Sequence, residues 1–311
     1  MNADGIKMFT KDQTSSHPNL IRTRSNSETP GQKKAEVPKP AVHAAEQMAR
    51  LNLPASIILS NDKAELKLDS LKFWNINRID IKENGQKLNF GIENPGSHYG
   101  IVYREQGSPF FVGSGHCESG KSEQVASLCI FADGKEVKPE AGTIHGKKIR
   151  VVKISNIGPF SVQYSFELNK NHLDEECVIT SKEAVKCHCI YFFMHPWSTR
   201  FKELHALQPG GNLTSLKFKS DNEFPAGMNT FYQSVAMFDP DSGDALLTKV
   251  ELVEGASAAP KRYIWDRPVY RKDYPTDYVN TVFPAEHKAA YHACTVFFPN
   301  NGKPVIPQIK Q

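Results

Sequence analysis

The sequence has no long hydrophobic run and only a few cysteines. No stretch of the 311 residues approaches the ~20 consecutive apolar residues of a membrane-spanning helix, so we expect no membrane contact. The first ten residues contain no apolar signal core, which argues against secretion. Six cysteines are too few for a disulfide scaffold in a chain of this length. We therefore expect reduced cysteines and a cytoplasmic location.

The sequence also lacks a strong net charge. The formal charge is +4, and residues 1–50 supply most of it, with 8 Lys or Arg against 5 Asp or Glu. The remaining 261 residues hold 30 basic and 29 acidic side chains. Because nucleic-acid binding needs a concentrated basic face, this balance argues against nucleic acid as the main ligand. No glycine-rich phosphate loop precedes a helical pattern, and we predict no cofactor.

The cysteines do not form a recognisable metal motif, since no Cys-x-x-Cys pair occurs. In Cys187-His188-Cys189, strand alternation would direct the histidine to the opposite side from both thiols. A tetrahedral zinc site would need two further ligands, such as Cys117 or Cys177, facing the same way. We predict core cysteines and no metal, with a nucleophilic pair of Cys117 and a histidine as the alternative.

Residues 1–53 differ in composition from the rest of the chain. Residues 1–40 are rich in Ser, Thr, Pro, Lys and Asn and poor in large apolar side chains, which predicts a disordered tail. Ala41 to Leu53 (AVHAAEQMARLNL) contains helix formers and predicts one short amphipathic helix. Two interpretations stay open for the tail: a segment that binds a protein partner, or a solvated leader without a specific role.

From Pro54 onward the pattern is that of β-strands. Apolar and polar residues alternate over Phe160–Leu168, as in a half-buried strand, and again around Leu66 and over Tyr291–Phe297. Between Val185 and Met194 both alternating faces are largely apolar, which indicates a strand between two layers. On one of these predicted faces lie Val185, Cys187, Cys189, Tyr191 and Phe193.

Turn residues separate these strands at short intervals. They occur at Glu83-Asn-Gly85, Ala132-Asp-Gly134, His145-Gly146, Asn156-Ile-Gly-Pro159, Asp239-Pro-Asp-Ser-Gly243 and Asn300-Asn-Gly302. Many short strands without a βαβ rhythm predict an all-β fold. We expect one large antiparallel β-sandwich over residues 54–311, preceded by a disordered N-terminal tail.

Two histidines lie where a strand pattern is interrupted. His116 and Glu118 stand in Gly113-Ser-Gly-His-Cys-Glu-Ser-Gly120, two residues apart, so in an extended chain they point the same way and can share proton transfer. The alternative is a polar turn. His195 precedes Pro196 and Trp197 and is expected to emerge from the core at the end of its strand. Trp197 would stack on a sugar ring, or it would simply fill the core.

A third region is crowded with aromatic, basic and acidic side chains. It runs from Tyr263 to Phe283 and is followed by Glu286, His287 and His292. Such a mixture suits a loop that faces a polyhydroxylated ligand, and it equally suits a surface loop packed by tyrosines. Glu286 would be a general base if it were buried.

The order of these features resembles the galactose-mutarotase-like β-sandwich superfamily, which includes aldose epimerases and sandwich domains of some polysaccharide lyases. The resembling segments are Phe73-Trp-Asn-Ile-Asn-Arg-Ile-Asp-Ile81, Ser114-Gly-His-Cys-Glu118 and Phe192-Phe-Met-His-Pro-Trp197, within a similarity over residues 55–300. In the epimerases two histidines and a late carboxylate surround the sugar. The resemblance thus implies that His116 takes the place of the first histidine, His195 that of the acid and Glu286 that of the base.

We therefore predict a protein that binds a carbohydrate and processes it by acid–base chemistry at a sugar ring, as an epimerase or a lyase does. His116, His195 and Glu286 would be catalytic, while Arg104, Glu118, Trp197 and Arg200 would hold the substrate. The alternative is a non-catalytic β-sandwich that binds a glycan or a protein. If His195 is catalytic, replacing it by Ala should abolish turnover and leave the melting temperature almost unchanged.

Overall fold

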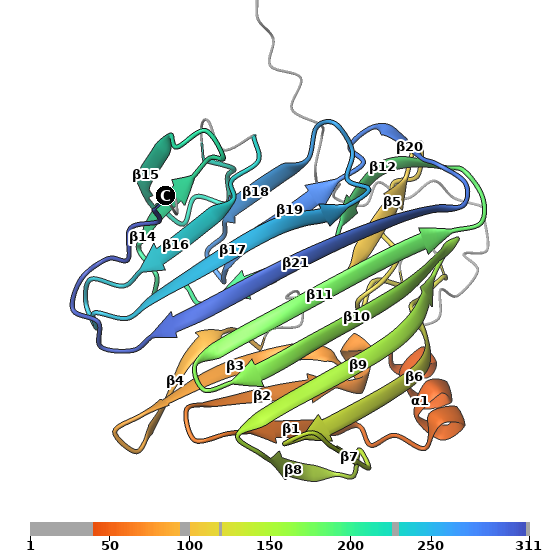
Figure 1. Ribbon diagram of the computed structural model, residues 1–311, viewed down its shortest axis with the longest axis horizontal. Coiled ribbons are helices and arrows are strands. Elements are labelled where there is room, and N and C mark those ends of the chain that lie inside the picture. The colour runs from red at the N-terminus through yellow and green to blue at the C-terminus, as the bar shows by residue number, and fades with distance from the viewer. Residues whose placement is uncertain (1–39, 94–99, 118–119, 226–229, 309–311) are drawn as a thin grey trace, which may run out of the picture. The chain divides into compact units, whose positions relative to one another are not determined.

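Strands make up most of the computed structural model, which describes residues 40–93, 100–117, 120–225 and 230–308 (Figure 1). These described residues lie in one compact unit of the chain. The predicted disordered tail lies outside them. One α-helix, α1 (Pro40–Leu51), forms where helix formers were expected, and a short 3-10 helix, η1 (Ser70–Lys72), follows the second strand.

The strands form two large sheets, and the fold is an antiparallel-rich β-sandwich. The eleven-stranded sheet consists of β1 (Ser56–Ser60), β2 (Ala64–Asp69), β3 (Asn75–Glu83), β4 (Gln86–Gly91), β5 (Val102–Glu105), β8 (Gly142–His145), β12 (Val185–Tyr191), β13 (His195–Trp197), β18 (Lys261–Asp266), β19 (Arg271–Asp277) and β20 (Thr281–Phe283). Its main order is β20-β12-β19-β13-β4-β3-β2-β1-β8, with β18 beside β19 and β5 beside β12. The pair β1 and β8 is parallel.

The ten-stranded sheet lies in front in Figure 1. It consists of β6 (Gln124–Ala132), β7 (Lys135–Val137), β9 (Lys148–Ile157), β10 (Phe160–Asn169), β11 (His172–Ser181), β14 (Glu203–Leu207), β15 (Leu213–Lys217), β16 (Ser234–Phe238), β17 (Ala245–Glu254) and β21 (His287–Phe298). Its order is β15-β14-β16-β17-β21-β11-β10-β9-β6-β7. The alternation predicted over Phe160–Leu168 is confirmed in β10.

The core lies between the two sheets. Phe90 of β4 contacts Phe297 of β21 at a ring-centroid distance of 5.5 Å, and Phe192 stacks on Tyr291 of β21 at 3.9 Å. Trp197 of β13 is fully buried against the same Phe297. Rings from distant parts of the sequence therefore hold the sheets face to face by burying their apolar surface.

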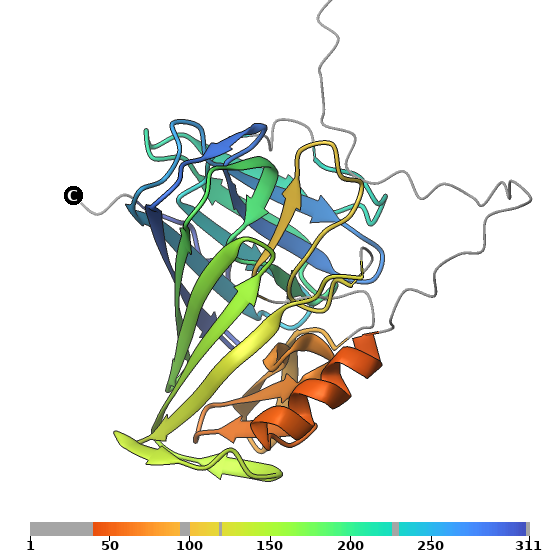
Figure 2. The ribbon, with the colours of Figure 1, turned by 90° about the vertical axis from the view of Figure 1, so that its right-hand side faces the viewer.

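Helix α1 packs beside the sandwich, next to its first strands (Figure 2). Its contacts are with η1 and β6, and Gln47 gives the clearest of them. The Gln47 amide donates to the carbonyl of Glu123 at 2.8 Å and accepts from the backbone N–H of Val125 at 2.8 Å. Among the described residues, no helix has the length and hydrophobicity needed to cross a membrane.

One predicted strand face is wrong. Cys187 and Cys189 of β12 were expected to share a face, but the pairing of β12 with β5 shifts register between them, as at a β-bulge. Cys187 belongs to the core between the sheets, whereas Cys189 interacts with Tyr191 and Arg104 on the other side. The extra residue rotates the rest of the strand, so Tyr191 points away from the core.

Candidate functional site

The candidate site is the outer face of the eleven-stranded sheet around β5, β12, β18 and β19. Alternation along β19 sets the two faces apart. Asp273 and Asp277 point inward: Asp273 accepts from the buried Arg262 of β18, and Asp277 accepts from Tyr291 of β21. Lys272 and Tyr274 therefore point outward. The hairpin replaces the loop that was expected in the Tyr263–Phe283 region.

Aromatic side chains from four segments meet on this outer face. Phe111 stacks on Tyr191 at 5.5 Å between centroids, and Tyr191 lies 4.8 Å from Tyr274. Tyr274 in turn lies 6.5 Å from Trp265, on which Phe224 stacks at 5.3 Å. We call the connected set the aromatic strip; it comprises Phe111, Tyr191, Phe224, Tyr263, Trp265, Tyr270 and Tyr274.

Two ring surfaces of the strip are only half-buried. Phe111 and Tyr274 are of intermediate exposure, and Phe110 beside Phe111 is exposed. At the opposite end Val269, next to Tyr270, is also exposed. Apolar surface that remains open at both ends of a ring cluster is suited to stacking against a ligand.

Cations accompany the rings. The guanidinium of Arg104 lies 5.3 Å from the centroid of Phe111, and that of Arg267 lies 4.4 Å from the centroid of Trp265. The ammonium of Lys272 lies 5.4 Å from the ring of Tyr270 and 5.3 Å from that of Tyr274. These are cation–π distances, so each positive charge lies within the attraction of a ring face.

Lys272 is almost completely buried, and its pKa is lowered well below the ordinary value. Burial is the main cause, and the positive charges of Lys72 and Arg267 add to it. We call these three residues the cation corner. Lys72 is itself 9% exposed and has a lowered pKa, again chiefly because of burial.

The acidic protons of the strip are held tightly. Burial raises the pKa of Tyr191 and of Tyr274 well above the usual range, and it raises the pKa of Cys189 to about 12. The phenols and the thiol are thus protonated near neutral pH. The pKa of His188 is lowered by burial and by Arg104, which keeps this imidazole neutral more readily. The strip therefore offers hydroxyl donors together with cations.

A buried polar network holds the segment that carries His116. The Ser114 hydroxyl donates to the carbonyl of Ile101 at 2.8 Å, and its backbone N–H donates to Glu123 at 3.2 Å. Glu123 forms an ion pair of 2.6 Å with Lys153, and both are 2% exposed. Gly113 has φ of +119°, and a Cβ there would collide with the Ile101 carbonyl. The glycine is thus required for the tight turn that positions this segment.

The structure brings together two of the predicted site residues, His116 and Arg104. Both contact Phe111, the histidine at 5.7 Å and the guanidinium at 5.3 Å from its ring centroid. Both are of intermediate exposure. Glu118, predicted to work with His116, lies outside the described residues. His116 therefore lies at one end of the aromatic strip.

His195 lies on the opposite face of the same sheet. Its side chain is 0% exposed, and its Nε2 atom lies 2.7 Å from a carboxylate oxygen of Glu175 on β11. The other oxygen of Glu175 accepts from the hydroxyl of Tyr164. His195 also stacks on Trp197 at 5.1 Å. The expectation that His195 emerges from the core is thus wrong: it joins the two sheets inside the core.

The remaining predicted residues lie elsewhere. Arg200 forms ion pairs with Asp239 and Asp244 and lies over Phe90. Glu286 is exposed in the turn between β20 and β21, with φ of +53°. The predicted catalytic residues His116, His195 and Glu286 thus occupy an outer face, the interior and a turn.

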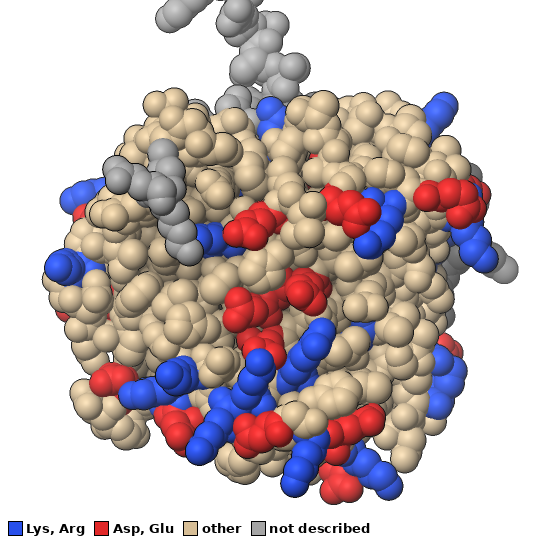
Figure 3. Space-filling model, viewed as in Figure 1, with Lys and Arg blue, Asp and Glu red and all other residues tan. Residues whose placement is uncertain are grey.

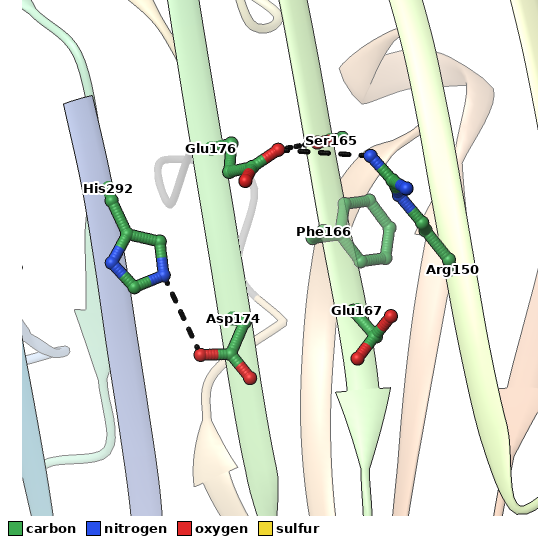
Figure 4. A pocket seen from close by; sticks show the side chains of 7 residues that line it. All are labelled: Arg150, Ser165, Phe166, Glu167, Asp174, Glu176 and His292. Carbon is green, nitrogen blue, oxygen red and sulfur yellow. Dashed lines mark hydrogen bonds and ion pairs between the residues drawn. The ribbon is translucent and has the colours of Figure 1, made fainter. Parts of the chain in front are cut away.

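The outer face of the ten-stranded sheet has a different character. Lys, Arg, Asp and Glu of both signs are interspersed on it (Figure 3). A shallow depression of about 190 Å³ is lined by Arg150, Ser165, Phe166, Glu167, Asp174, Glu176 and His292 (Figure 4). His292 lies 3.7 Å from Asp174, and Arg150 lies 3.8 Å from Glu176. Exposed cross-strand pairs of this kind are typical of a solvated sheet surface.

Among the residues that the structure describes, no group of three or more His, Cys, Asp or Glu side chains is placed to hold a metal ion. All six cysteines are free thiols.

Sequence reasoning recognised the richness of the Tyr263–Phe283 region but selected none of its residues as ligand-binding. Trp265, Arg267, Lys272 and Tyr274 belong to it. Their alternation within β18 and β19 was the available signal, because a strand directs every second side chain to one face. Tyr191 was missed because the bulge in β12 leaves no mark in the sequence.

The comparisons with known proteins gave structural matches only. No family model matches the chain, and no curated protein does. A galactose mutarotase related enzyme from Lactobacillus acidophilus matches 81% of this chain and 100% of its own, at 10% identity and a TM-score of 0.46. A galactose mutarotase-like protein from Lactobacillus casei matches 78% of this chain and 100% of its own, at 10% identity and a TM-score of 0.46.

A further match is part of a larger enzyme. The GH36 alpha-galactosidase AgaA from Geobacillus stearothermophilus, in complex with stachyose, matches 78% of this chain over 40% of its own length, at 8% identity and a TM-score of 0.43. The chain is thus similar in structure to galactose-mutarotase-like proteins, which is the resemblance that the sequence suggested.

Proposed function

We propose that the protein binds a carbohydrate on the aromatic strip of the eleven-stranded sheet. The observation that carries the proposal is the gathering of seven aromatic side chains on one outer sheet face, with Phe111 and Tyr274 still half-exposed. Sugar rings have flat apolar faces that stack on such rings, and their hydroxyls hydrogen-bond to neighbouring polar groups. The protonated phenols of Tyr191 and Tyr274 supply donors for those hydroxyls.

A glycan array with the full chain, followed by titration calorimetry on the best glycan, tests the proposal. Replacing Tyr274 by Ala should weaken binding about tenfold, because it removes the half-exposed stacking surface at the middle of the strip. Phe131 of β6 is also half-buried but lies on the ten-stranded sheet, so Phe131→Ala is the matched control. Equal losses in both variants, or no glycan bound, would contradict the proposal; capture of a protein instead would favour the alternative ligand.

Processing of the sugar by acid–base chemistry is a finer proposal, and the geometry supports it less than binding. His116 lies beside the strip, but His195 lies on the other face of the sheet and Glu286 in an exposed turn. A ligand on the strip would thus contact only His116 of the three. We therefore favour binding without turnover by this trio.

Turnover can be tested directly. The interconversion of sugar anomers in the presence of the protein is followed by polarimetry or NMR, with His116→Gln as the variant. Acceleration by the unaltered protein that His116→Gln abolishes would establish epimerase-like chemistry, whereas rates equal to those of buffer would support a binding protein.

A further inference from the structure

Two arginines of the candidate site differ from the others in how their Nε atoms are satisfied. In the described part of the chain, the buried Nε atoms of Arg104 and Arg267 have no hydrogen-bond partner. By contrast, Nε of Arg262 donates to Asp273 at 2.8 Å and Nε of Arg271 donates to the carbonyl of Phe201 at 3.2 Å. A buried donor without an acceptor costs free energy, so these two positions require an explanation.

Both of these arginines lie on the aromatic strip, near its two ends. Arg104 lies over Phe111, and Arg267 lies over Trp265 and Tyr270. One of the Arg267 nitrogens donates to the Tyr270 hydroxyl at 2.5 Å, which fixes the direction of the guanidinium plane. A ligand acceptor that reaches Nε would thus meet a guanidinium already held in place.

At the Arg267 end the positive charges are crowded. Lys272 and Lys72 interact with each other, and Arg267 acts on the same ammonium. Their mutual repulsion opposes folding, while the rings of Tyr270 and Tyr274 offset it only in part by cation–π attraction. A bound anion would relieve the repulsion and accept from the guanidinium fork.

We infer that the ligand of the aromatic strip is an acidic carbohydrate, whose carboxylate, sulfate or phosphate group is bound by Arg267 and Lys272 while its sugar ring stacks on Tyr274. The inference rests on the proposed carbohydrate binding and adds the class of the ligand. Arg267 suits planar or tetrahedral oxyanions because its nitrogens lie in a fixed fork. Lys272 provides a second, compact charge close to the same tyrosine ring.

The experiment compares ligands that differ only in the anionic group. Galactose, galacturonate, galactose 6-phosphate and inorganic phosphate are each titrated into the full chain and followed by calorimetry. We expect galacturonate or galactose 6-phosphate to bind at least tenfold more tightly than galactose. Which of the two binds more tightly identifies the group as a carboxylate or a phosphate.

Variants assign the preference to the cation corner. Arg267→Gln should remove the tenfold preference, and Arg267→Lys, which keeps the charge but loses the fork, should retain part of it. Lys272→Met should also reduce the preference. Arg150→Gln is the matched control, because Arg150 is a half-exposed arginine on the ten-stranded sheet. Thermal unfolding of each variant verifies that it is folded.

The outcomes separate this inference from the proposed function. If galactose binds as tightly as its acidic counterparts, or if Arg267→Gln keeps the preference, the acidic ligand is refuted and carbohydrate binding stands. If inorganic phosphate binds through Arg267 and no sugar adds to its affinity, the anion site stands and the carbohydrate is refuted. If none of the four ligands binds, both proposals are refuted.

Discussion

The two faces of β19 handle charge in opposite ways. On the inner face Asp273 is bound by two nitrogens of Arg262, at 2.8 and 2.6 Å, and both side chains are fully buried. On the outer face Lys272 lies among tyrosine rings and two other cations. Opposite charges inside the sandwich neutralise each other, whereas like charges outside create a site that favours an anion. The comparison separates a stabilising face from a binding face within one strand.

The largest expected effect comes from breaking the inner pair. Asp273→Ala leaves the buried guanidinium of Arg262 without its carboxylate and should lower the free energy of unfolding by about 3–5 kcal/mol. Urea denaturation measures it. As a control, Glu254→Ala breaks the exposed pair of Glu254 and Lys288 and should change stability by only about 0.5 kcal/mol. Similar losses in the two variants would refute the distinction between buried and exposed pairs.

His195 belongs with the inner face, and its replacement should destabilise the protein. His195→Ala opens a cavity beside Trp197 and leaves the buried carboxylate of Glu175 without this partner. We expect a loss of about 2–4 kcal/mol, measured by thermal unfolding. The sequence-based expectation was the reverse, an almost unchanged melting temperature with lost turnover. An unchanged melting temperature would favour that catalytic role again.

On the outer face, Lys272→Met should change how stability depends on pH. Because the pKa of Lys272 is lowered in the folded state, its protonated form is disfavoured there. This penalty is complete below the lowered pKa and disappears as pH rises toward the unfolded value of about 10.4. The variant should therefore be more stable than the unaltered protein at neutral pH, and the difference should shrink with rising pH. Urea denaturation from pH 6 to pH 10 measures it, and a difference that grows would contradict the assignment.

The smallest effect is expected at the turn. Glu286 is exposed, so Glu286→Gln should change neither the free energy of unfolding nor glycan affinity by more than about 0.5 kcal/mol. Calorimetry and urea denaturation check this. A large loss of affinity would bring the turn back into the site.

The sequence was informative where a strand is regular. Alternation predicted β10 and the sandwich, because a half-buried strand must place apolar residues at every second position. The bulge between Cys187 and Cys189 was not predictable, since it depends on pairing with a segment some eighty residues earlier in the chain. It decides where Tyr191 points, and hence the middle of the aromatic strip.

The direction of His195 was equally hidden. Apolar residues on both sides of it fit a histidine leaving the core as well as one inside it. Only Glu175 on β11 of the other sheet provides the buried partner that makes the interior position tolerable. Residues of the candidate site that come from one hairpin were thus visible in the sequence, whereas those that depend on contacts between sheets were not.

Helix α1 bears on the design of shorter versions of the protein. Gln47 holds the backbone at Glu123 and Val125, and the Glu123 carboxylate in turn holds the Ser114 backbone just ahead of His116. A gene trimmed to begin at residue 54 would yield all the strands and lose this support. Such a product should fold and yet present a loosened loop at the Arg104 end, so crystallisation and screening are best done with a chain that starts before Pro40.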